Sequence, residues 1–150
     1  MPNNDLYEQQ LLIEASPADV FDALINPLKT RLYMYNCEPV CDWEVASPLL
    51  WRGALDDVVY VKGHLLVYEP DKELTYTVFD PTGSIEDIPE NYLTTRIVLE
   101  EVEDATLVKV SQGDFEKVAN GEERFKHADG GWNMVLNGLK ELVETELSTS

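Results

Sequence analysis

The last quarter of the chain carries an amphipathic pattern that needs another part of the molecule to cover it. Residues 128–144 read ADGGWNMVLNGLKELVE. The apolar side chains recur there at helical spacing, and charged residues take the other side. The apolar set is Trp132, Val135, Leu136, Leu139, Leu142 and Val143. We predict a helix over 131–147, about 25 Å long at about 1.5 Å per residue, with Gly130-Gly131 as its entry loop or as a break.

The middle of the chain follows a different period. Between Cys37 and Gln112, apolar and polar residues alternate, which is typical of strands with one buried face. A shorter stretch near the beginning of the chain alternates in the same way. The expected strands are Leu6–Ala15, Cys37–Val45, Leu49–Gly53, Val58–Tyr68, Leu74–Val78, Tyr92–Val102 and Thr106–Val110.

Two short helices are expected after the first strand, in the sequence SPADVFDALINPL. Ser16 is a natural N-cap, Pro17 fits the first helical position, and Asp19 completes a capping pattern. Asn26-Pro27 ends this helix and begins the second one. The order is therefore one strand, two helices, six strands and a final long helix. A sheet that curves around this helix buries both apolar surfaces, which predicts an α+β fold in a single domain, 1–150.

The charge of the chain limits its partners. Asp and Glu number 29 against 11 Lys and Arg, so the net charge is −18. Such a field repels nucleic acid backbones and anionic lipid surfaces, and we expect neither as a partner.

Several features indicate a cytoplasmic protein. The start of the chain lacks the features of a secretory signal, and no apolar run approaches the roughly 20 residues of a membrane span. Cys37 and Cys41 lie four residues apart in an expected strand, roughly 13 Å from each other, which is too far for a disulfide. We expect both to be reduced.

Four stretches, taken in chain order, resemble a known family. They are SPADVFDAL at the first helix, PLLWRG at 48–53, KGHLLVYEPDKELTYTVFDP in a hairpin, and GWNMVLNGLKELV in the last helix. Together the chain resembles the activator-of-heat-shock-protein-90-ATPase-like branch of the START, or birch-pollen-allergen-like, superfamily. The resemblance implies a helix-grip fold: a curved, seven-stranded antiparallel sheet, two short helices, and a long C-terminal helix across the concave face. It also implies a cavity between that helix and the sheet.

Sequence motifs for catalysis are not found. The glycines form neither a dinucleotide-binding nor a Walker pattern, and no nucleophile elbow is present. His64 and His127 are interpreted as structural residues. Cys37, Cys41 and His64 would converge on a metal only by accident of sheet register. We therefore expect no catalytic residue, no metal and no cofactor.

The aromatic residues are the candidate binding residues. They lie on different elements that the fold would bring together, and such side chains suit a flat or elongated apolar ligand. Core packing is the alternative for each of them. The candidate set is Trp43, Trp51, Tyr60, Tyr76, Tyr92, Trp132, Leu136 and Leu139. The polar loop Pro81–Glu90 is expected at one rim, where it could act as a lid.

Three functions remain open. The first is a monomeric binding protein that holds an apolar or aromatic small molecule, such as a lipid, under the last helix. The second, implied by the resemblance, is a heat-shock chaperone accessory with a role in stress response. The characterised activators carry a further N-terminal module for which this chain has no room. The third is an enzyme of the cyclase or dehydratase kind, which would need an acid–base residue in the cavity.

Overall fold

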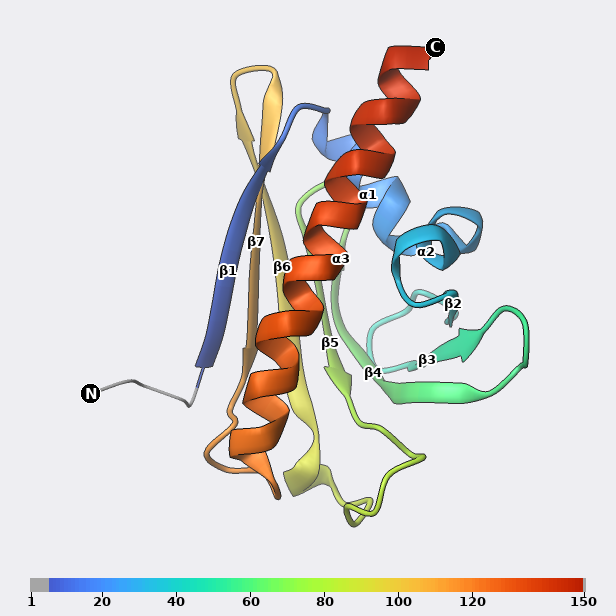
Figure 1. Cartoon of the computed structure of the whole chain (residues 1–150), viewed down its shortest axis with the longest axis vertical. Coiled ribbons are helices and arrows are strands. Elements are labelled where there is room, and N and C mark those ends of the chain that lie inside the picture. Colours follow the sequence, from blue (N-terminus) through green and yellow to red (C-terminus); the bar gives the residue numbers. More distant parts are fainter. Residues whose placement is uncertain (1–5, 150) are drawn as a thin grey trace.

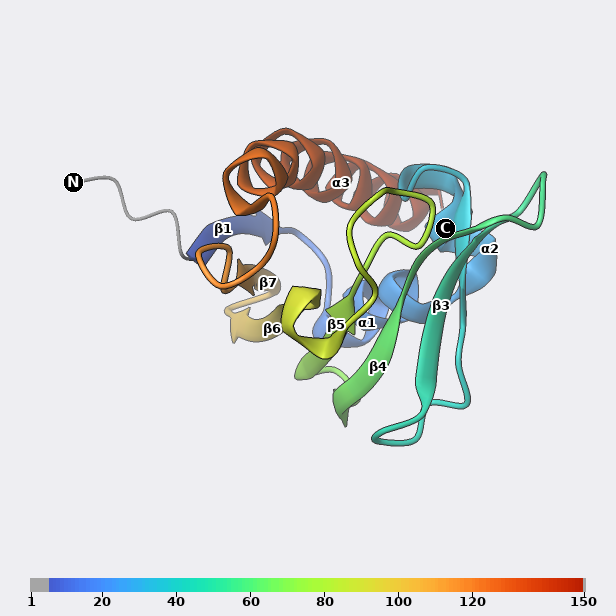
Figure 2. The same ribbon diagram turned by 90° about the horizontal axis from the view of Figure 1, so that it is seen from below.

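The computed structural model describes residues 6–149, and their side chains through residue 145. One antiparallel sheet of seven strands, in the order β1-β7-β6-β5-β4-β3-β2, curves beneath a long C-terminal helix (Figures 1 and 2). The predicted α+β helix-grip fold is confirmed. The elements are β1 (Leu6–Ile13), α1 (Pro17–Ile25), α2 (Pro27–Tyr33), β2 (Cys37–Val40), β3 (Pro48–Gly53), β4 (Val59–Glu69), β5 (Glu73–Val78), the 3₁₀ turn η1 (Pro89–Asn91), β6 (Leu93–Val102), β7 (Ala105–Gly113) and α3 (Gly121–Thr149).

The two short helices begin where the sequence predicts. The Ser16 side chain accepts a hydrogen bond from the backbone N–H of Asp19 at 3.2 Å, and Pro17 occupies the first turn of α1. Asn26 ends α1 and caps α2, since its side chain accepts from the N–H of Leu28 at 3.0 Å. A single residue therefore turns the chain from one helix into the next.

The start of α3 differs from the prediction. The helix begins at Gly121, ten residues before the predicted position, so Gly130 and Gly131 lie inside it. The sequence EERFKHA at 122–128 favours a helix, and its two leading glutamates suit the positive end of the helix dipole. A glycine is required at this first position of the helix, because a Cβ on Gly121 would lie 1.7 Å from the carbonyl oxygen of Phe115.

The predicted strand Cys37–Val45 is also too long, since β2 ends at Val40. The backbone of Trp43 has a φ of 59° and that of Ala46 a φ of 76°, so the chain leaves the sheet and turns back toward β3. Both cysteines are free, as expected, with Cys37 buried and Cys41 half-buried.

The apolar side chains form two clusters rather than one. The main cluster joins α1 and the later turns of α3 to the sheet, through residues such as Phe21, Leu65 and Leu139. The second cluster holds the beginning of α3 and consists of Tyr7, Leu93, Phe115 and Val118, with Phe125 packed against it. Val78 and Trp132 pack against both clusters and connect them.

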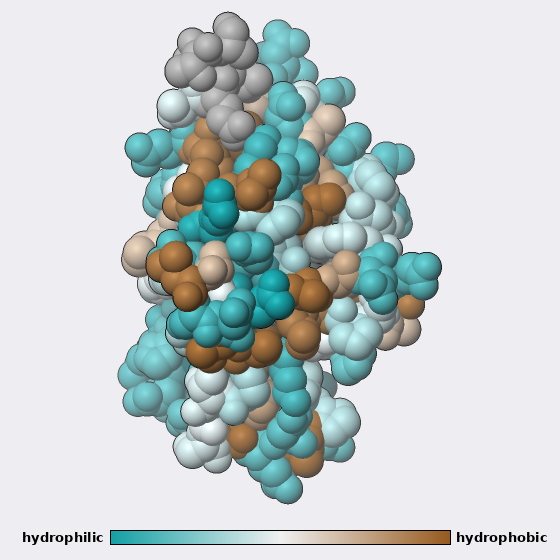
Figure 3. All heavy atoms as spheres, turned by 90° about the vertical axis from the view of Figure 1, so that its right-hand side faces the viewer, coloured by the Kyte–Doolittle hydropathy of each residue, from teal (hydrophilic) through white to brown (hydrophobic). Residues whose placement is uncertain are grey.

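The surface around α2 keeps some apolar side chains outside both clusters. Figure 3 shows apolar residues interspersed with hydrophilic ones on the side of the molecule that lies to the right in Figure 1. Leu28 and Leu32 of α2 are 61% and 66% exposed, and Leu55 of the β3–β4 loop is 88% exposed. No described helix combines the length and apolarity that a membrane crossing requires.

Candidate functional site

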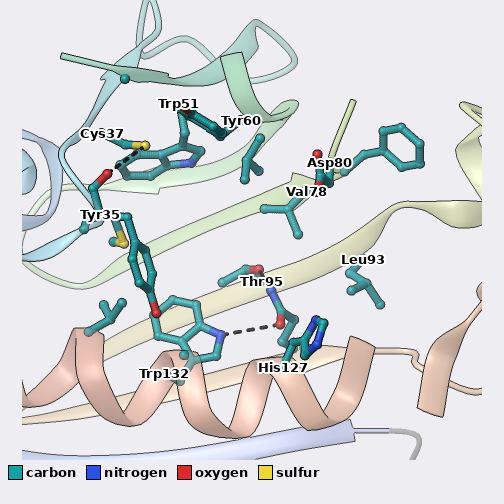
Figure 4. A pocket seen from close by; sticks show the side chains of 18 of the residues that line it. Tyr35, Cys37, Trp51, Tyr60, Val78, Asp80, Leu93, Thr95, His127 and Trp132 are labelled. Carbon is teal, nitrogen blue, oxygen red and sulfur yellow. Dashed lines mark hydrogen bonds between the residues drawn. The ribbon is translucent and has the colours of Figure 1, made fainter. Parts of the chain in front are cut away.

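A cavity of about 640 Å³ lies between the concave face of the sheet and α3 (Figure 4). Its lining comes from nearly every element that surrounds it. The α2–β2 loop and β2 supply Met34, Tyr35, Asn36 and Cys37; β3, β4 and their loop supply Trp51, Gly53, Leu55, Asp56, Tyr60 and Val61; β5 and the residues after it supply Tyr76, Val78, Phe79 and Asp80; β6 and β7 supply Leu93, Thr95 and Gln112; α3 supplies Arg124, His127, Ala128, Gly131, Trp132 and Val135.

The walls are mainly aromatic. Trp51 and Tyr76 are 5% and 3% exposed, and their ring centroids lie 6.0 Å apart. Trp132 closes the opposite side from α3 (Figure 4). Burial raises the pKa of the Tyr76 phenol far above its ordinary value. Its hydroxyl makes no hydrogen bond to any of the described residues, so a buried polar group faces this region without a protein partner.

A polar network crosses from α3 to the sheet. The Nε1 of Trp132 donates to the Oε1 of Gln112 at 3.4 Å, and the Nε2 of Gln112 donates to the Oγ1 of Thr95 at 2.7 Å. Thr95 is 0% exposed. The network fixes the orientation of the indole and places an amide in the wall of the cavity.

Asp56 and Tyr60 form a hydrogen bond at the mouth of the cavity. The hydroxyl of Tyr60 donates to the carboxylate of Asp56. This bond lowers the pKa of Asp56 and raises that of Tyr60. Tyr35 reaches from the α2–β2 loop toward α3 (Figure 4), where a Cβ on Gly131 would lie 3.4 Å from its hydroxyl. The absence of a side chain at Gly131 therefore leaves space for this tyrosine.

The segment between β5 and β6 is tied to its neighbours. Lys62 of β4 forms an ion pair with Asp87, and the Tyr92 hydroxyl donates to the same carboxylate at 2.7 Å. Asn91 donates to the carbonyl of Glu86 at 2.8 Å. Within the cavity lining, the segment is represented only by Phe79 and Asp80 at its start. A lid function for Pro81–Glu90 stays a hypothesis.

The predicted binding residues separate into two groups. Trp51, Tyr60, Tyr76 and Trp132 line the cavity. The other four lie outside its lining. Trp43 packs against Tyr68 with ring centroids 5.5 Å apart, Tyr92 stacks on Phe79 at 4.9 Å, and Leu136 and Leu139 are buried in the main cluster. Contact of the first group with a ligand stays a prediction.

Polar lining residues were missed, although the sequence holds signals for two of them. Thr95 lies in an alternating run with Leu93 and Ile97, so it is a polar residue on an apolar face. Gln112 follows Val108 and Val110 in the same way. Arg124 precedes Ala128 by one helical turn, but the prediction began the helix too late to include it.

The titratable groups do not assemble into a metal site. Within residues 6–145, no group of three or more His, Cys, Asp or Glu could hold a metal ion. His64 and His127 are exposed rather than packed in the core, and His127 lies on the cavity rim. The lining includes ionisable side chains, Asp56 and Asp80 among them, so the acid–base residue that an enzyme would need is not ruled out by the lining.

Solved structures similar to this chain share its fold over almost its full length. The solution structure of ChR145 from Cytophaga hutchinsonii is 30% identical, with a TM-score of 0.76, and the match covers 99% of each chain. The Aha1 dimer from Colwellia psychrerythraea is 18% identical, with a TM-score of 0.73, over 93% of this chain and 96% of that one. An HSP90 activator from Plasmodium falciparum is 15% identical, with a TM-score of 0.68, over the same shares.

No curated protein matches the chain. The sequence model of one protein family, described as Activator of Hsp90 ATPase homolog 1-like protein, matches residues 14–144. Since this match covers most of the sequence, including every strand after β1 and the cavity wall on α3, the chain belongs to the Activator of Hsp90 ATPase homolog 1-like family.

Proposed function

We propose that the protein binds a small molecule with a flat aromatic or elongated apolar body in the cavity beneath α3. The observation that carries this proposal is the cavity itself. Protein interiors are normally close-packed, yet about 640 Å³ stays open between Trp51, Tyr76 and Trp132. Known ligand sites have volumes of about 300–1,000 Å³ and combine apolar walls with a few polar groups.

The polar groups of the cavity support the same function. Tyr76 is 3% exposed as a residue, and its hydroxyl has no protein partner. Such a buried group costs free energy unless a ligand or solvent supplies the hydrogen bond. The amide of Gln112 likewise retains hydrogen-bonding capacity beyond its two observed bonds. These groups would orient a ligand whose body is held by the aromatic walls.

A thermal-shift screen of flat aromatic compounds and fatty acids tests the proposal. A ligand at a hundred times its Kd adds about 2.7 kcal/mol to the free energy of unfolding, which raises Tm by roughly 5–10 °C in a domain of this size. The matched control is Ala128→Phe, which fills part of the cavity from α3 and should abolish the shift. If no compound at saturation raises Tm, the binding proposal fails.

A second candidate is a chaperone accessory, favoured by the family and by exposed leucines on α2. Leu28 and Leu32 are available to a protein partner on that helix. A pull-down with the Hsp90 of the same organism, followed by an ATPase assay, tests this function, with Leu32→Asp expected to weaken both signals. Absence of contact with wild-type protein would remove the candidate.

The proposed place of action is the cytoplasm. Two free cysteines, one of them only half-buried, suit a reducing compartment. We also propose that the protein acts as a monomer, which size-exclusion chromatography with light scattering would check.

A further inference from the structure

Several hydrogen-bond donors of the cavity have no partner among the described residues. Trp132 fixes the assignment, because an indole nitrogen can only donate. The atom 3.4 Å from it must therefore be the carbonyl oxygen of Gln112, and the amino group of that amide points to Thr95. The Thr95 oxygen accepts, and its own O–H has no acceptor among the described residues. The hydroxyl of Tyr76 and the second N–H of the Gln112 amide also have no acceptor among the described residues.

Two carboxylates of the lining already accept hydrogen bonds from the protein. The carboxylate of Asp56 accepts from the Tyr60 hydroxyl and, at 3.0 Å, from the backbone N–H of Val58. The Oδ1 of Asp80 accepts from both the N–H and the hydroxyl of Thr82, at 2.8 and 2.6 Å. A ligand that brings acceptor oxygens can pair with the free donors of Thr95, Gln112 and Tyr76.

Arg124 adds a positive charge to the same surface. Its side chain is half-buried on α3 and lines the cavity, and its Nη1 donates to the carbonyl of Asn91 at 2.9 Å. No carboxylate of the described residues lies within ion-pair distance of it, in a chain with 29 acidic and 11 basic residues. Burial lowers the pKa of this guanidinium, while the charge of Asp80 acts in the opposite direction. The positive charge of Arg124 is therefore available to pair with an anionic group of a ligand.

We propose that the cavity takes an amphipathic carboxylic acid, with the carboxylate on Arg124 and the apolar body between Trp51 and Trp132. This inference rests on the proposed binding function and names its ligand class. A carboxylate only accepts hydrogen bonds and carries a negative charge, so it fits both the N–H groups and the unpaired charge of Arg124. Arg124 and Trp132 lie eight residues apart on α3, about 12 Å at about 1.5 Å per residue, so the acid group is separated from the ring system by a short chain.

The test compares pyrenebutanoic acid with its primary amide, which has the same ring system and chain without the charge. Pyrene fluorescence reports the binding of both. The acid should bind wild-type protein about ten- to a hundredfold more tightly than the amide, the range expected for a charge-assisted hydrogen bond. In Arg124→Gln this preference should disappear, because a buried carboxylate without a cation loses more hydration than it regains. Arg124→Lys should keep part of it.

Two further variants separate the local interaction from charge in general. Asp80→Asn removes the negative charge near Arg124 but keeps the oxygen that accepts from Thr82, so the acid should bind severalfold more tightly and the amide as before. Arg52→Gln removes a positive charge from an exposed position on β3 outside the lining and should change neither affinity. Melting curves check that each variant folds. If Arg124→Gln does not fold, the affinities of the acid and the amide for wild-type protein and for Asp80→Asn still decide the question.

The outcomes distinguish this inference from the proposed function. If acid and amide both bind and bind equally, or if Asp80→Asn leaves the acid unchanged, the carboxylate inference is overturned while ligand binding stands. If neither compound binds, and no acid–amide pair built on the compounds of the thermal-shift screen binds, both the inference and the proposed function fail.

Discussion

The side chain of Asn91, at the end of η1, joins two segments that are 28 residues apart by accepting a hydrogen bond from the backbone N–H of Ala119 at 2.9 Å. The same side chain donates to the carbonyl of Glu86, and its backbone carbonyl accepts from Arg124. Asn91 is 7% exposed. One buried residue thus holds the β5–β6 segment, the β7–α3 loop and the start of α3 in register.

Removal of the Asn91 side chain should therefore lower stability considerably. Asn91→Ala leaves the N–H of Ala119 without its partner and removes one of the two hydrogen bonds to the carbonyl of Glu86, which keeps the one from Ile88. We expect a loss of about 1–3 kcal/mol in the free energy of unfolding. Urea denaturation measures it. Asn137→Ala, at an exposed position on α3, is the matched control and should change stability by less than about 0.5 kcal/mol. Equal effects of the two changes would contradict the role given to Asn91.

The Trp132–Gln112–Thr95 network should also stabilise the fold. Gln112→Leu keeps the approximate size of the side chain but leaves the Thr95 oxygen and the Trp132 indole without their observed partners. We expect a loss of about 1–3 kcal/mol, measured by urea denaturation, together with a change in tryptophan fluorescence as the indole loses its hydrogen bond. Gln10→Leu, at an exposed position of β1, controls for the added apolar side chain. A Gln112→Leu protein as stable as this control would show that the network is dispensable.

The two adjacent glycines of α3 provide a matched pair. A Cβ at Gly130 would meet nothing within 4 Å, whereas one at Gly131 would lie 3.4 Å from the Tyr35 hydroxyl. Alanine is favoured over glycine inside a helix, so Gly130→Ala should raise stability by about 0.5–1 kcal/mol, and Gly131→Ala by less. Thermal denaturation checks both changes. If Gly130→Ala destabilises the protein, the helix does not run through this position.

The bonds of Asp87 should make stability depend on acid pH. The hydrogen bond from Lys62, and after it the one from Tyr92, lowers the pKa of Asp87 below its ordinary value near 3.8. A carboxyl with a lowered pKa in the folded state stabilises it above the unfolded-state pKa, and this contribution is lost as the pH falls through the folded-state value. The stability difference between wild type and Asp87→Asn should therefore be present at pH 6 and shrink below about pH 4.

Denaturation of both proteins between pH 6 and pH 2 measures this difference, and the other carboxyl groups cancel in the comparison. Asp104→Asn, on the exposed β6–β7 turn, is the control for the loss of one negative charge. A difference that stays constant over the whole range would show that the ion pair with Lys62 does not form in solution.

The sequence was sufficient for the architecture because local signals and packing agree. The cap at Ser16, the turn at Asn26-Pro27 and the alternation in β6 and β7 each indicate the structure that the fold then adopts. The errors arose where a local signal was read without its tertiary context. Gly130-Gly131 reads as a helix boundary, yet the packing of Phe125 in the second cluster carries the helix back to Gly121.

The cavity was harder to predict than the fold. Aromatic residues fill cores as readily as they line pockets. Only the three-dimensional structure shows that Trp51 lines the cavity and that Trp43 does not. Thr95 and Gln112 were more informative, because a polar residue on the buried face of a strand needs a partner. A search for polar residues that interrupt an apolar alternation would have located them. Arg124 required the correct helix start, which tertiary packing sets.

The continuity of α3 from one apolar cluster to the other affects how a ligand could enter the cavity. The beginning of α3 packs in the second cluster and its later turns pack in the main cluster. Between these two parts the helix contains two consecutive glycines, Gly130 and Gly131. Helices bend most readily at such positions. We therefore expect the mouth of the cavity to widen when α3 bends at these glycines, while both ends of the helix stay in place.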